Sequence, residues 1–360
     1  MKRILYIVTR AVTAGGVMSV VSKKINYLSE QGYKITLLSM TRCEEPFYEL
    51  SSNIELVSCT HNDGMSASLS DLMFSIRFIR SHQFDVIVSA DAQYITWLLP
   101  LITSTPTVLE LHQSYDGLVE FYRRSRFPKL NVFLHKIMQK FCYSMYKRVV
   151  VLTEEDKEKW KLNNCMVIPN FHDRQIVEII QCKKKKIVCL GRFHYQKGYD
   201  LLIAIWKKLA LQFPDWELHY YGVDEDNNVK RELLKLGAPS SFKIMGFEKD
   251  QDIIFGDAYL NIVPSRNESF SLTIIEAMTY GVPSVSFSST GPKSIIHSGI
   301  DGELVSNFDI DRASCAIERL INDKEYYNIM SGRCIVSASN YSKNTIMHKW
   351  ESLFLTCMKD

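Results

Sequence analysis

Short runs of apolar residues, most of them separated by helical patterns, recur along this chain and strongly limit how it can fold. In the N-terminal part we predict strands at residues 4–8, 33–40, 85–89, 106–111 and 148–152. A continuous apolar run of this length is typical of a parallel strand that is covered on both faces. After residue 170 the pattern starts again, and we predict strands at residues 187–190, 216–221, 242–245, 260–263 and 284–287. The sequence therefore predicts an α/β fold with parallel sheets.

The restart of the pattern predicts two Rossmann-like, doubly wound domains that face a central cleft. We expect an N-terminal domain over residues 1–170 and a C-terminal domain over residues 171–342. The last predicted helix, residues 343–358, is expected to pack back on the N-terminal domain. A chain of 360 residues is long enough to bury two such cores without disulfide bonds.

Composition places the chain among ordinary folded proteins. Hydrophobic residues make up 46% of the sequence, which excludes a disordered chain. Lys and Arg total 43 against 40 Asp and Glu, so the formal charge of +3 does not indicate a nucleic-acid partner. The nine cysteines are odd in number and form no C-x-x-C pair, which favours free thiols in a reducing compartment. No secretory signal is visible, and no apolar stretch approaches the roughly 20 residues that span a bilayer, so we expect a cytoplasmic protein.

Two glutamates flank the beginning of a predicted helix in the C-terminal half. A strand ends at Pro264, a loop carries Glu268, and a helix that contains Glu276 is expected to start near Phe270. The N–H groups at the start of a helix suit a phosphate, and carboxylates accept hydrogen bonds from pairs of sugar hydroxyls. From spacing alone, the segment is equally compatible with a charge at a helix N terminus and an exposed glutamate in mid-helix.

This segment resembles the EX7E motif of retaining glycosyltransferase family 4, whose members have the GT-B fold. Glu268 is followed, after seven residues, by Glu276-Ala277-Met278 and then by Gly281-Val282-Pro283. Other blocks of the family recur in the family's order, namely Val167-Ile168-Pro169-Asn170, Gly191-Arg192-Phe193 with Lys197-Gly198, and Gly291-Pro292 with Gly302-Glu303-Leu304-Val305. Each block is weak by itself, but together and in this order they identify the chain as a member of the family.

The resemblance implies roles for side chains in the C-terminal half. Arg192 and Lys197 would neutralise the diphosphate of the leaving nucleotide, and two cations after a strand end suit that task chemically. Glu276 would hold the ribose hydroxyls and Glu268 the donor sugar. An isolated pair of cations on a loop would otherwise be interpreted as solvated surface residues.

The resemblance also assigns backbone groups and one histidine. The amides near Ser271 and Leu272 would bind the donor phosphates, and Gly16, at the first strand-to-helix turn, would approach the phosphate from the N-terminal domain. His112 follows a predicted strand and would lie near the reacting sugar. From sequence alone, Gly16 is equally compatible with a tight turn. A lone histidine after a strand, such as His112, is more often structural, and only the family position favours a role at the site.

Two departures from the family pattern leave the donor sugar open. Ser269 and Ser271 stand where many members have glycines, and Lys293-Ser294 stands where relatives often carry an acidic residue. Two D-x-D segments, residues 224–226 and 309–311, suggest a metal site, but we interpret the second as a helix N-cap. Because family members generally need no metal for catalysis, we expect neither a metal nor another cofactor.

A basic and aromatic stretch runs from residue 121 to residue 153, with eight Lys or Arg and no Asp or Glu. Cations beside large apolar residues on a helix predict a membrane-surface element. We expect the anionic inner leaflet to be contacted by Arg123, Arg124, Arg126, Lys129, Lys136 and Lys140. RNA binding is the competing interpretation, although no nucleic-acid module supports it. The third interpretation is an ordinary amphipathic helix whose apolar face lies in the core.

Together these features predict a cytoplasmic enzyme that is peripheral on the inner face of the plasma membrane. It would transfer a hexose or N-acetylhexosamine, with retention, from a nucleotide-sugar donor, for which we expect a UDP-sugar. The acceptor would be a growing, lipid-linked glycan in the biosynthesis of lipopolysaccharide O-antigen, capsule or exopolysaccharide. The alternatives are a GT-B epimerase or phosphorylase, or a catalytically silent partner that binds the donor within a membrane complex.

Overall fold

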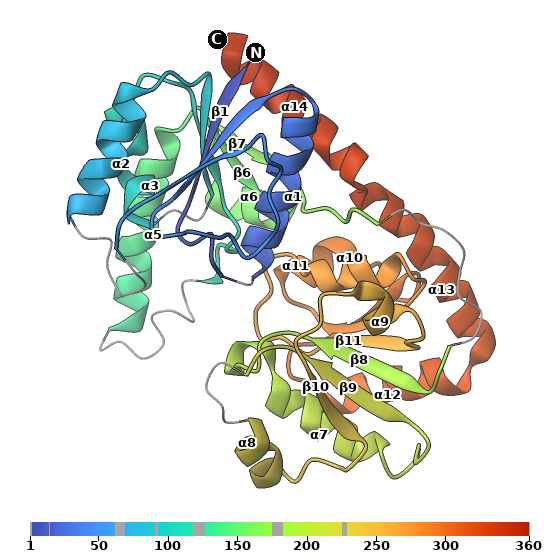
Figure 1. The fold of residues 1–360 in the computed structure, drawn as a ribbon. Coiled ribbons are helices and arrows are strands. Elements are labelled where there is room, and N and C mark those ends of the chain that lie inside the picture. Colours follow the sequence, from blue (N-terminus) through green and yellow to red (C-terminus); the bar gives the residue numbers. More distant parts are fainter. Residues whose placement is uncertain are drawn as a thin grey trace. The chain divides into compact units, whose positions relative to one another are not determined.

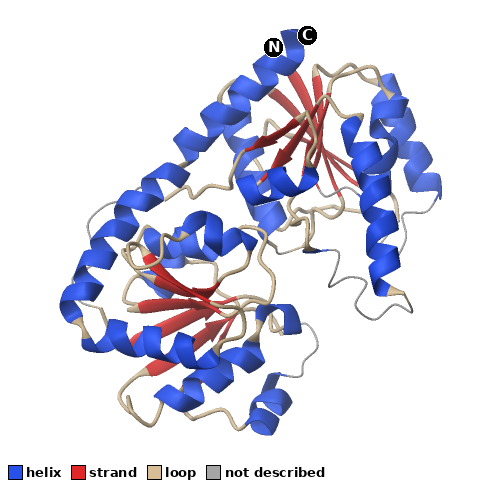
Figure 2. Ribbon diagram, turned by 180° about the vertical axis from the view of Figure 1, so that it is seen from behind, coloured by secondary structure: helices blue, strands red, loops and turns tan. Residues whose placement is uncertain are grey.

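The computed structural model describes residues 2–13, 15–61, 69–90, 93–117, 127–174, 183–224 and 229–359. It divides into two compact units. Unit 1 consists of Met1–Asn170 and Ile346–Asp360, and unit 2 consists of Phe171–Thr345. Each unit is a parallel sheet with helices packed against it (Figures 1 and 2). The predicted α/β class is therefore confirmed.

Unit 1 contains a seven-stranded sheet in the order β3-β2-β1-β4-β5-β6-β7. Its strands are β1 (Arg3–Val8), β2 (Lys34–Ser39), β3 (Glu55–Ser58), β4 (Val86–Ala90), β5 (Thr107–Glu110), β6 (Arg148–Val151) and β7 (Cys165–Val167). All the pairings are parallel, and β1 lies between β2 and β4. The strand order reverses between β1 and β4. In doubly wound sheets, ligands bind beyond the carboxyl ends of the strands at such a reversal.

The helices of unit 1 bury one face each against this sheet or against one another. They are α1 (Gly16–Glu30), α2 (Leu69–Ser81), α3 (Gln93–Ile102), α5 (Pro128–Ser144), α6 (Glu154–Trp160) and α14 (Lys343–Lys359), the last from Ile346 on. On α1 the buried residues Val21, Ile25 and Leu28 recur at helical spacing. The two ends of the chain lie close together in this unit (Figure 1).

Unit 2 repeats the plan with six parallel strands in the order β10-β9-β8-β11-β12-β13. They are β8 (Lys186–Leu190), β9 (Glu217–Tyr221), β10 (Phe242–Gly246), β11 (Leu260–Val263), β12 (Ser284–Phe287) and β13 (Gly302–Val305). Here the order reverses between β8 and β11, which are hydrogen-bonded neighbours. The segments that follow these two strands therefore leave the sheet side by side.

The helical segments of unit 2 include two short 3-10 turns. In chain order they are η1 (Tyr195–Lys197), α7 (Tyr199–Leu209), α8 (Val229–Leu236), α9 (Gln251–Phe255), α10 (Leu272–Met278), α11 (Thr290–Ile295), α12 (Ile310–Asn322), α13 (Lys324–Ala338) and η2 (Ser339–Tyr341). As the sequence predicted, Asp309 caps α12, and its carboxylate accepts a hydrogen bond from the backbone N–H of Arg312 at 3.0 Å. Among the described residues, no helix combines the length and the apolar character that crossing a bilayer requires.

Every strand predicted from the sequence is present, with ends that agree to within one residue. The structure adds β3, β7 and β13, which are short or carry a polar residue and so give little periodic signal. The helix expected near Phe270 begins at Leu272 instead and is seven residues long. Its delayed start follows from the conformation of Ser271, described below.

Candidate active site

The loop between β11 and α10 brings Glu268 onto Lys197, which ends the 3-10 turn after β8. The ammonium of Lys197 donates to Glu268 Oε1 at 2.5 Å, and the hydroxyl of Ser265 donates to the same oxygen at 2.8 Å. The side chains of Lys197 and Glu268 are 25% and 13% exposed, so solvent screens the pair only partly. Two residues that are 71 positions apart in the sequence, both predicted for the site, are thus in direct contact.

A second ion pair, which the sequence did not indicate, fastens this loop to the turn that carries Lys197. Arg266 donates to the two carboxylate oxygens of Asp200 at 2.8 and 2.7 Å, and its guanidinium lies 3.6 Å from the ring centre of Tyr195. The backbone N–H of Arg266 also donates to the carbonyl of Gln196 at 2.8 Å. Burial alone would raise the pKa of Asp200, but the hydrogen bonds and the charge of Arg266 hold it below its usual value.

Two glycines allow the close approach of these segments. Gly198 has a φ of +69°, and a Cβ there would lie 2.0 Å from the carbonyl oxygen of Pro264. A Cβ on Gly291 would lie 2.5 Å from the backbone of Phe270, and the N–H of Gly291 donates to the carbonyl of Glu268 at 2.9 Å. Both glycines belong to the sequence blocks quoted above, and the structure gives a steric reason for each.

Ser271 explains why the helix starts late. It caps α10 with a φ of +79°, a left-handed conformation that non-glycine residues rarely adopt, and it is 7% exposed. Its hydroxyl lies 3.2 Å from the hydroxyl of Thr273. The family that this segment resembles often has glycine at this position, and a positive φ is the conformation that glycine adopts without strain.

Arg192 and Glu276 complete the set predicted for unit 2. Arg192 is exposed in the turn that follows β8, and its carbonyl accepts a hydrogen bond from the hydroxyl of Tyr220 at 3.0 Å. Glu276 is half-buried on α10, one turn after Leu272. Arg192 and Lys197 therefore follow β8, whereas Glu268 and α10 follow β11, at the reversal of strand order where doubly wound sheets bind ligands.

Unit 1 holds the other two predicted residues beyond the carboxyl ends of its central strands. Gly16 is the exposed first residue of α1, and Gly15 before it is an extended N-cap with no side-chain cap. His112 follows β5, and its imidazole is 6% exposed. Its Nε2 lies 3.2 Å from an oxygen of Glu110, a buried carboxylate that the sequence analysis did not identify.

The basic stretch is only partly as expected. Arg123, Arg124 and Arg126 lie outside the described residues. Lys129 and Lys140 are exposed on α5, as a surface role requires. Lys136 is less exposed than these two, because its ammonium lies 3.5 Å from the ring centre of Tyr115 and 3.8 Å from Asp116, and its side chain is 16% exposed.

The apolar face of α5 does not lie in the core. At least 52% of each side chain is exposed for the apolar residues that we call the α5 surface, namely Phe127, Leu130, Phe133, Leu134, Ile137, Met138 and Phe141. The side chains that α5 buries are instead Gln139 and Tyr143, which are hydrogen-bonded to each other at 3.0 Å. The interpretation of α5 as an ordinary amphipathic helix with its apolar face in the core is therefore wrong.

No group of three or more His, Cys, Asp or Glu side chains in the described part of the chain is arranged to hold a metal ion. Of the two D-x-D segments, Asp309 is the N-cap of α12, and Asp224 accepts a hydrogen bond from the N–H of Val229 at 3.0 Å. Glu225 and Asp226 lie outside the described residues.

Comparison with known proteins assigns both halves of the chain to glycosyltransferases. Residues 14–175 match the family described as Glycosyltransferase Family 4, and residues 173–333 match the family described as Glycosyl transferases group 1. The amylovoran biosynthesis glycosyltransferase AmsD of Erwinia amylovora is 24% identical over 98% of this chain and 99% of its own length.

Two solved structures superpose on nearly the whole chain. Sucrose-phosphate synthase of Thermosynechococcus elongatus superposes with a TM-score of 0.82 and 16% identity, covering 99% of both chains. The Anabaena protein Alr3699/HepE, solved with UDP and glucose, superposes with a TM-score of 0.78 and 15% identity, covering 99% of this chain and 100% of its own. These likenesses show the fold. Together with the family matches, they establish that the chain is a glycosyltransferase with the GT-B fold.

Proposed function

We propose that this protein transfers a hexose or N-acetylhexosamine, with retention of configuration, from a UDP-sugar to a growing, lipid-linked bacterial glycan. The proposed binding of the nucleotide-sugar donor is supported by the contact between Lys197 and Glu268 at the strand-order reversal of unit 2. A cation and a carboxylate in contact provide one group for a diphosphate and one for sugar hydroxyls. Retention and the lipid-linked acceptor rest on the family resemblance.

The donor would be held by groups that follow β8 and β11. Arg192 and Lys197 would contact the diphosphate, Glu276 the ribose, and Glu268 the sugar, while the amides at Ser271 and Leu272 would contact the phosphates. Lys197 is paired with Glu268 in the unliganded protein, so a diphosphate would compete with that carboxylate for the ammonium. Releasing Glu268 from Lys197 would also free a carboxylate oxygen to accept hydrogen bonds from the sugar.

Transfer would need little acid–base help from side chains. As the bond between the anomeric carbon and the UDP oxygen breaks, an acceptor hydroxyl would bond to that carbon from the same face. The hydroxyl proton would pass to the departing phosphate. The negative charge that develops on this phosphate would be stabilised by Arg192 and Lys197, and such fixed electrostatic groups commonly supply the largest part of catalysis. In unit 1, Gly16 would offer backbone N–H groups to the phosphate, and His112 would lie near the sugar.

Two of the comparisons support the choice of donor and pathway. The Anabaena structure was solved with UDP and glucose, which favours a uridine nucleotide here. The Erwinia relative is named for amylovoran biosynthesis, which favours a polysaccharide pathway such as O-antigen, capsule or exopolysaccharide assembly. A cytoplasmic site on the inner face of the membrane follows from such a pathway, because nucleotide-sugars are its donors.

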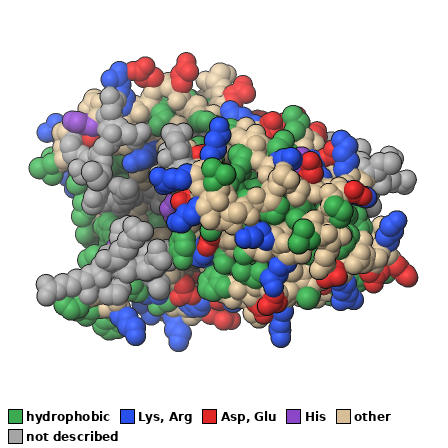
Figure 3. Space-filling model, turned by 90° about the horizontal axis from the view of Figure 1, so that it is seen from below, with side chains coloured by type: hydrophobic (Ala, Val, Ile, Leu, Met, Phe, Trp, Pro, Cys, Tyr) green, Lys and Arg blue, Asp and Glu red, His purple; other side chains and the backbone are tan. Residues whose placement is uncertain are grey.

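The α5 surface would dock the enzyme on anionic lipid. Seven large apolar side chains are exposed there, and the exposed cations Lys129 and Lys140 lie on the same helix. Exposed apolar residues beside lysines are typical of helices that lie in a membrane interface, where each cation gains about 1 kcal/mol from an anionic leaflet. On the face seen in Figure 3, basic and acidic side chains are interspersed. A pocket at the end of α5 is lined by apolar residues and lysines in the same way. Its lining includes Ile137, Lys140, Phe141, Lys161 and Leu162.

The donor can be identified by a thermal-shift screen of nucleotide-sugars, followed by transfer to a lipid-linked acceptor. A ligand at 100 times its Kd stabilises a protein by about 2.7 kcal/mol, which such a screen detects. We expect a UDP-sugar to stabilise the protein and NMR to show the same anomeric configuration in donor and product. Inversion would refute retention, and stabilisation only by nucleotides other than UDP would refute the donor class. Turnover of the donor without an acceptor would instead indicate an epimerase.

A further inference from the structure

A fully buried ion pair lies beside His112 in unit 1. Lys24 of α1 donates to Oε1 of Glu110 at the end of β5, and each side chain is 1% exposed. Nε2 of His112 lies 3.2 Å from the same carboxylate oxygen. The ammonium of Lys24 also lies 3.7 Å from the ring centre of Trp350 on α14. Lys24 and His112 thus both lie against one carboxylate oxygen of Glu110, and Trp350 covers the ammonium of Lys24.

The carboxylate in this cluster is charged. Burial alone would raise the pKa of Glu110, but the charge of Lys24 and the hydrogen bond that it donates oppose that shift, and the pKa is lowered to about 2. Burial lowers the pKa of Lys24, and the charge of Glu110 and its hydrogen bond oppose that shift. The pair is therefore held as a carboxylate and an ammonium, stabilised further by the indole face of Trp350.

Stability alone does not account for such a pair. The cost of taking two charges out of water is often as large as their attraction, so apolar residues of similar volume commonly serve as well. One oxygen of Glu110, Oε2, has no hydrogen-bond partner among the described residues, and neither does Nε2 of His112 by strict geometry. Glu110 Oε1 nevertheless lies 3.2 Å from that nitrogen, which is within hydrogen-bond distance.

We propose that the buried Lys24–Glu110 pair is a positioning device that keeps a proton of His112 on Nε2 and leaves Nδ1 as the nitrogen that accepts from the substrate. This inference rests on the proposed role of His112 near the reacting sugar. Glu110 and Lys24 would act through the imidazole and would not touch the substrate themselves. In a neutral imidazole the hydrogen bond made by one nitrogen decides which tautomer is present, and a carboxylate at Nε2 selects the Nε2–H form.

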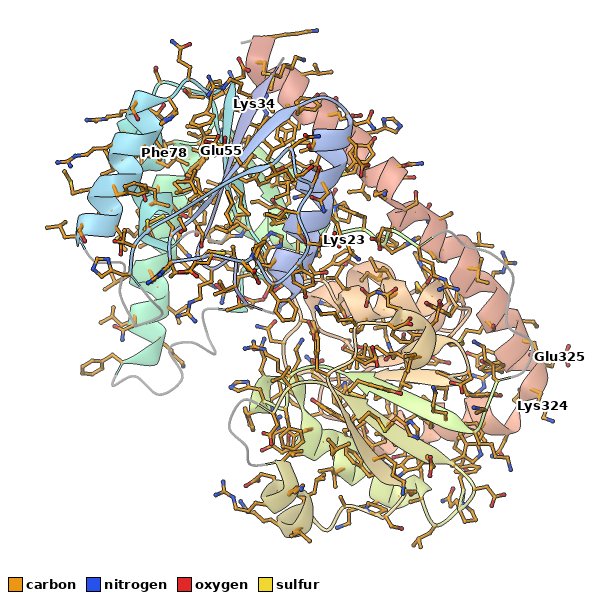
Figure 4. The ribbon with its side chains drawn as sticks, in the orientation of Figure 1. Lys23, Lys34, Glu55, Phe78, Lys324 and Glu325 are labelled. Carbon is orange, nitrogen blue, oxygen red and sulfur yellow. The ribbon has the colours of Figure 1, made fainter. Side chains whose placement is uncertain are left out.

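The decisive variant is the double substitution Lys24→Met with Glu110→Gln, because it removes both charges and keeps similar volumes. Lys24→Met alone would leave a buried unpaired carboxylate and is expected to unfold the chain. The matched control is Lys23→Met. Lys23, labelled on α1 in Figure 4, precedes Lys24 in the sequence but is only half-buried. All three proteins carry 15N-labelled histidine, and the signal of His112 is assigned by its loss in a His112→Gln variant.

We expect His112 in the wild type and in Lys23→Met to show the Nε2–H tautomer by NMR, and the double variant to show a mixture of tautomers. Turnover should fall at least tenfold in the double variant, while the Kd for UDP, measured by calorimetry, should stay within twofold. A purely structural pair would change thermal stability without changing the tautomer.

A wild-type His112 protonated on Nδ1 would overturn the proposal, and so would a folded double variant with the wild-type tautomer and turnover. The NMR result does not depend on sugar transfer. If no donor is transferred by the wild type, the proposed function fails, whereas the tautomer still decides whether Glu110 positions His112.

Discussion

Arg266 and Asp200 form a bidentate ion pair, in which Nη1 and Nη2 of the arginine donate to the two carboxylate oxygens at 2.8 and 2.7 Å. The pair joins the loop after β11 to the first turn of α7, and so joins the segment that carries Glu268 to the segment that carries Lys197. Both side chains are partly buried, at 14% and 30% exposure, which makes the pair stronger than an ordinary surface salt bridge. This contact between the two segments of the candidate site lies outside the residues proposed to bind the donor.

Arg266→Lys should lower turnover about tenfold, equivalent to about 1.4 kcal/mol of transition-state stabilisation. Lysine keeps the charge but cannot donate to both carboxylate oxygens in a plane or stack on Tyr195 as arginine does. Steady-state kinetics with the identified donor measure the effect. Lys208→Met, which removes the exposed ion pair with Asp311, is the matched control and should leave turnover unchanged. Equal rates for Arg266→Lys and the wild type would show that the loop holds its position without this pair.

Arg192→Ala and Lys197→Ala should each lower turnover at least tenfold while the protein stays folded. Both residues lie in the turn after β8, and neither contributes to the core of unit 2. Circular dichroism checks the fold, and a transfer assay checks the rate. Arg231→Ala on α8, where the side chain is 77% exposed, serves as the control cation. Wild-type rates in the Arg192 and Lys197 variants would refute their assignment to the diphosphate.

The two glutamates should respond differently to free UDP. Glu268→Gln removes the carboxylate that holds Lys197, so UDP should bind at least as tightly as to the wild type, while the complete donor should bind more weakly. Glu276→Gln should weaken both ligands, because the ribose is common to them. Calorimetry with UDP and with the donor tests this division. Equal losses for both variants with both ligands would contradict it.

Ser271→Gly should stabilise unit 2. A left-handed conformation costs a non-glycine residue about 1–2 kcal/mol, and glycine loses about 0.5–1 kcal/mol more backbone entropy on folding, so we expect a net gain of about 0.5–1 kcal/mol. Ser269→Gly is the control, because Ser269 is not among the described residues with positive φ and should therefore be destabilised by the same substitution. Urea unfolding measures both changes. A loss of stability in Ser271→Gly would mean that the serine hydroxyl outweighs the backbone strain.

Binding to anionic vesicles should depend on the α5 surface. Replacing Phe133 and Phe141 by Ser, or Lys129 and Lys140 by Gln, should release the protein in a sedimentation assay, while donor binding is unchanged. Salt should weaken the binding of the wild type, since the Debye length falls to about 3 Å at 1 M. Lys136→Gln is the matched control and should bind as the wild type does, because Lys136 already contacts Tyr115 and Asp116. Binding that is absent, or insensitive to salt, would contradict docking through charge.

The sequence by itself determined most of the strands, and it predicted where along the chain the candidate donor site lies. Parallel strands that are covered on both faces must be apolar throughout, so runs such as residues 4–8 and 260–263 can be recognised without tertiary information. Helix caps are equally local, and Asp309 was identified as one from the residues that follow it. The segment from Glu268 to Pro283 can be recognised from its residue spacing, because it lies within one loop and one helix that are contiguous in the sequence.

Only the tertiary structure decided which distant groups meet and which faces are covered. Arg266 and Asp200, or Glu110, Lys24 and His112, lie on different elements, and nothing in their spacing indicates a contact. The periodicity of α5 defines an apolar face but not its neighbours, so the sequence could not show that this face is exposed or that Lys136 turns back onto Tyr115. The physical reason is that periodicity is a property of one element, whereas burial and ion pairing depend on the elements packed against it.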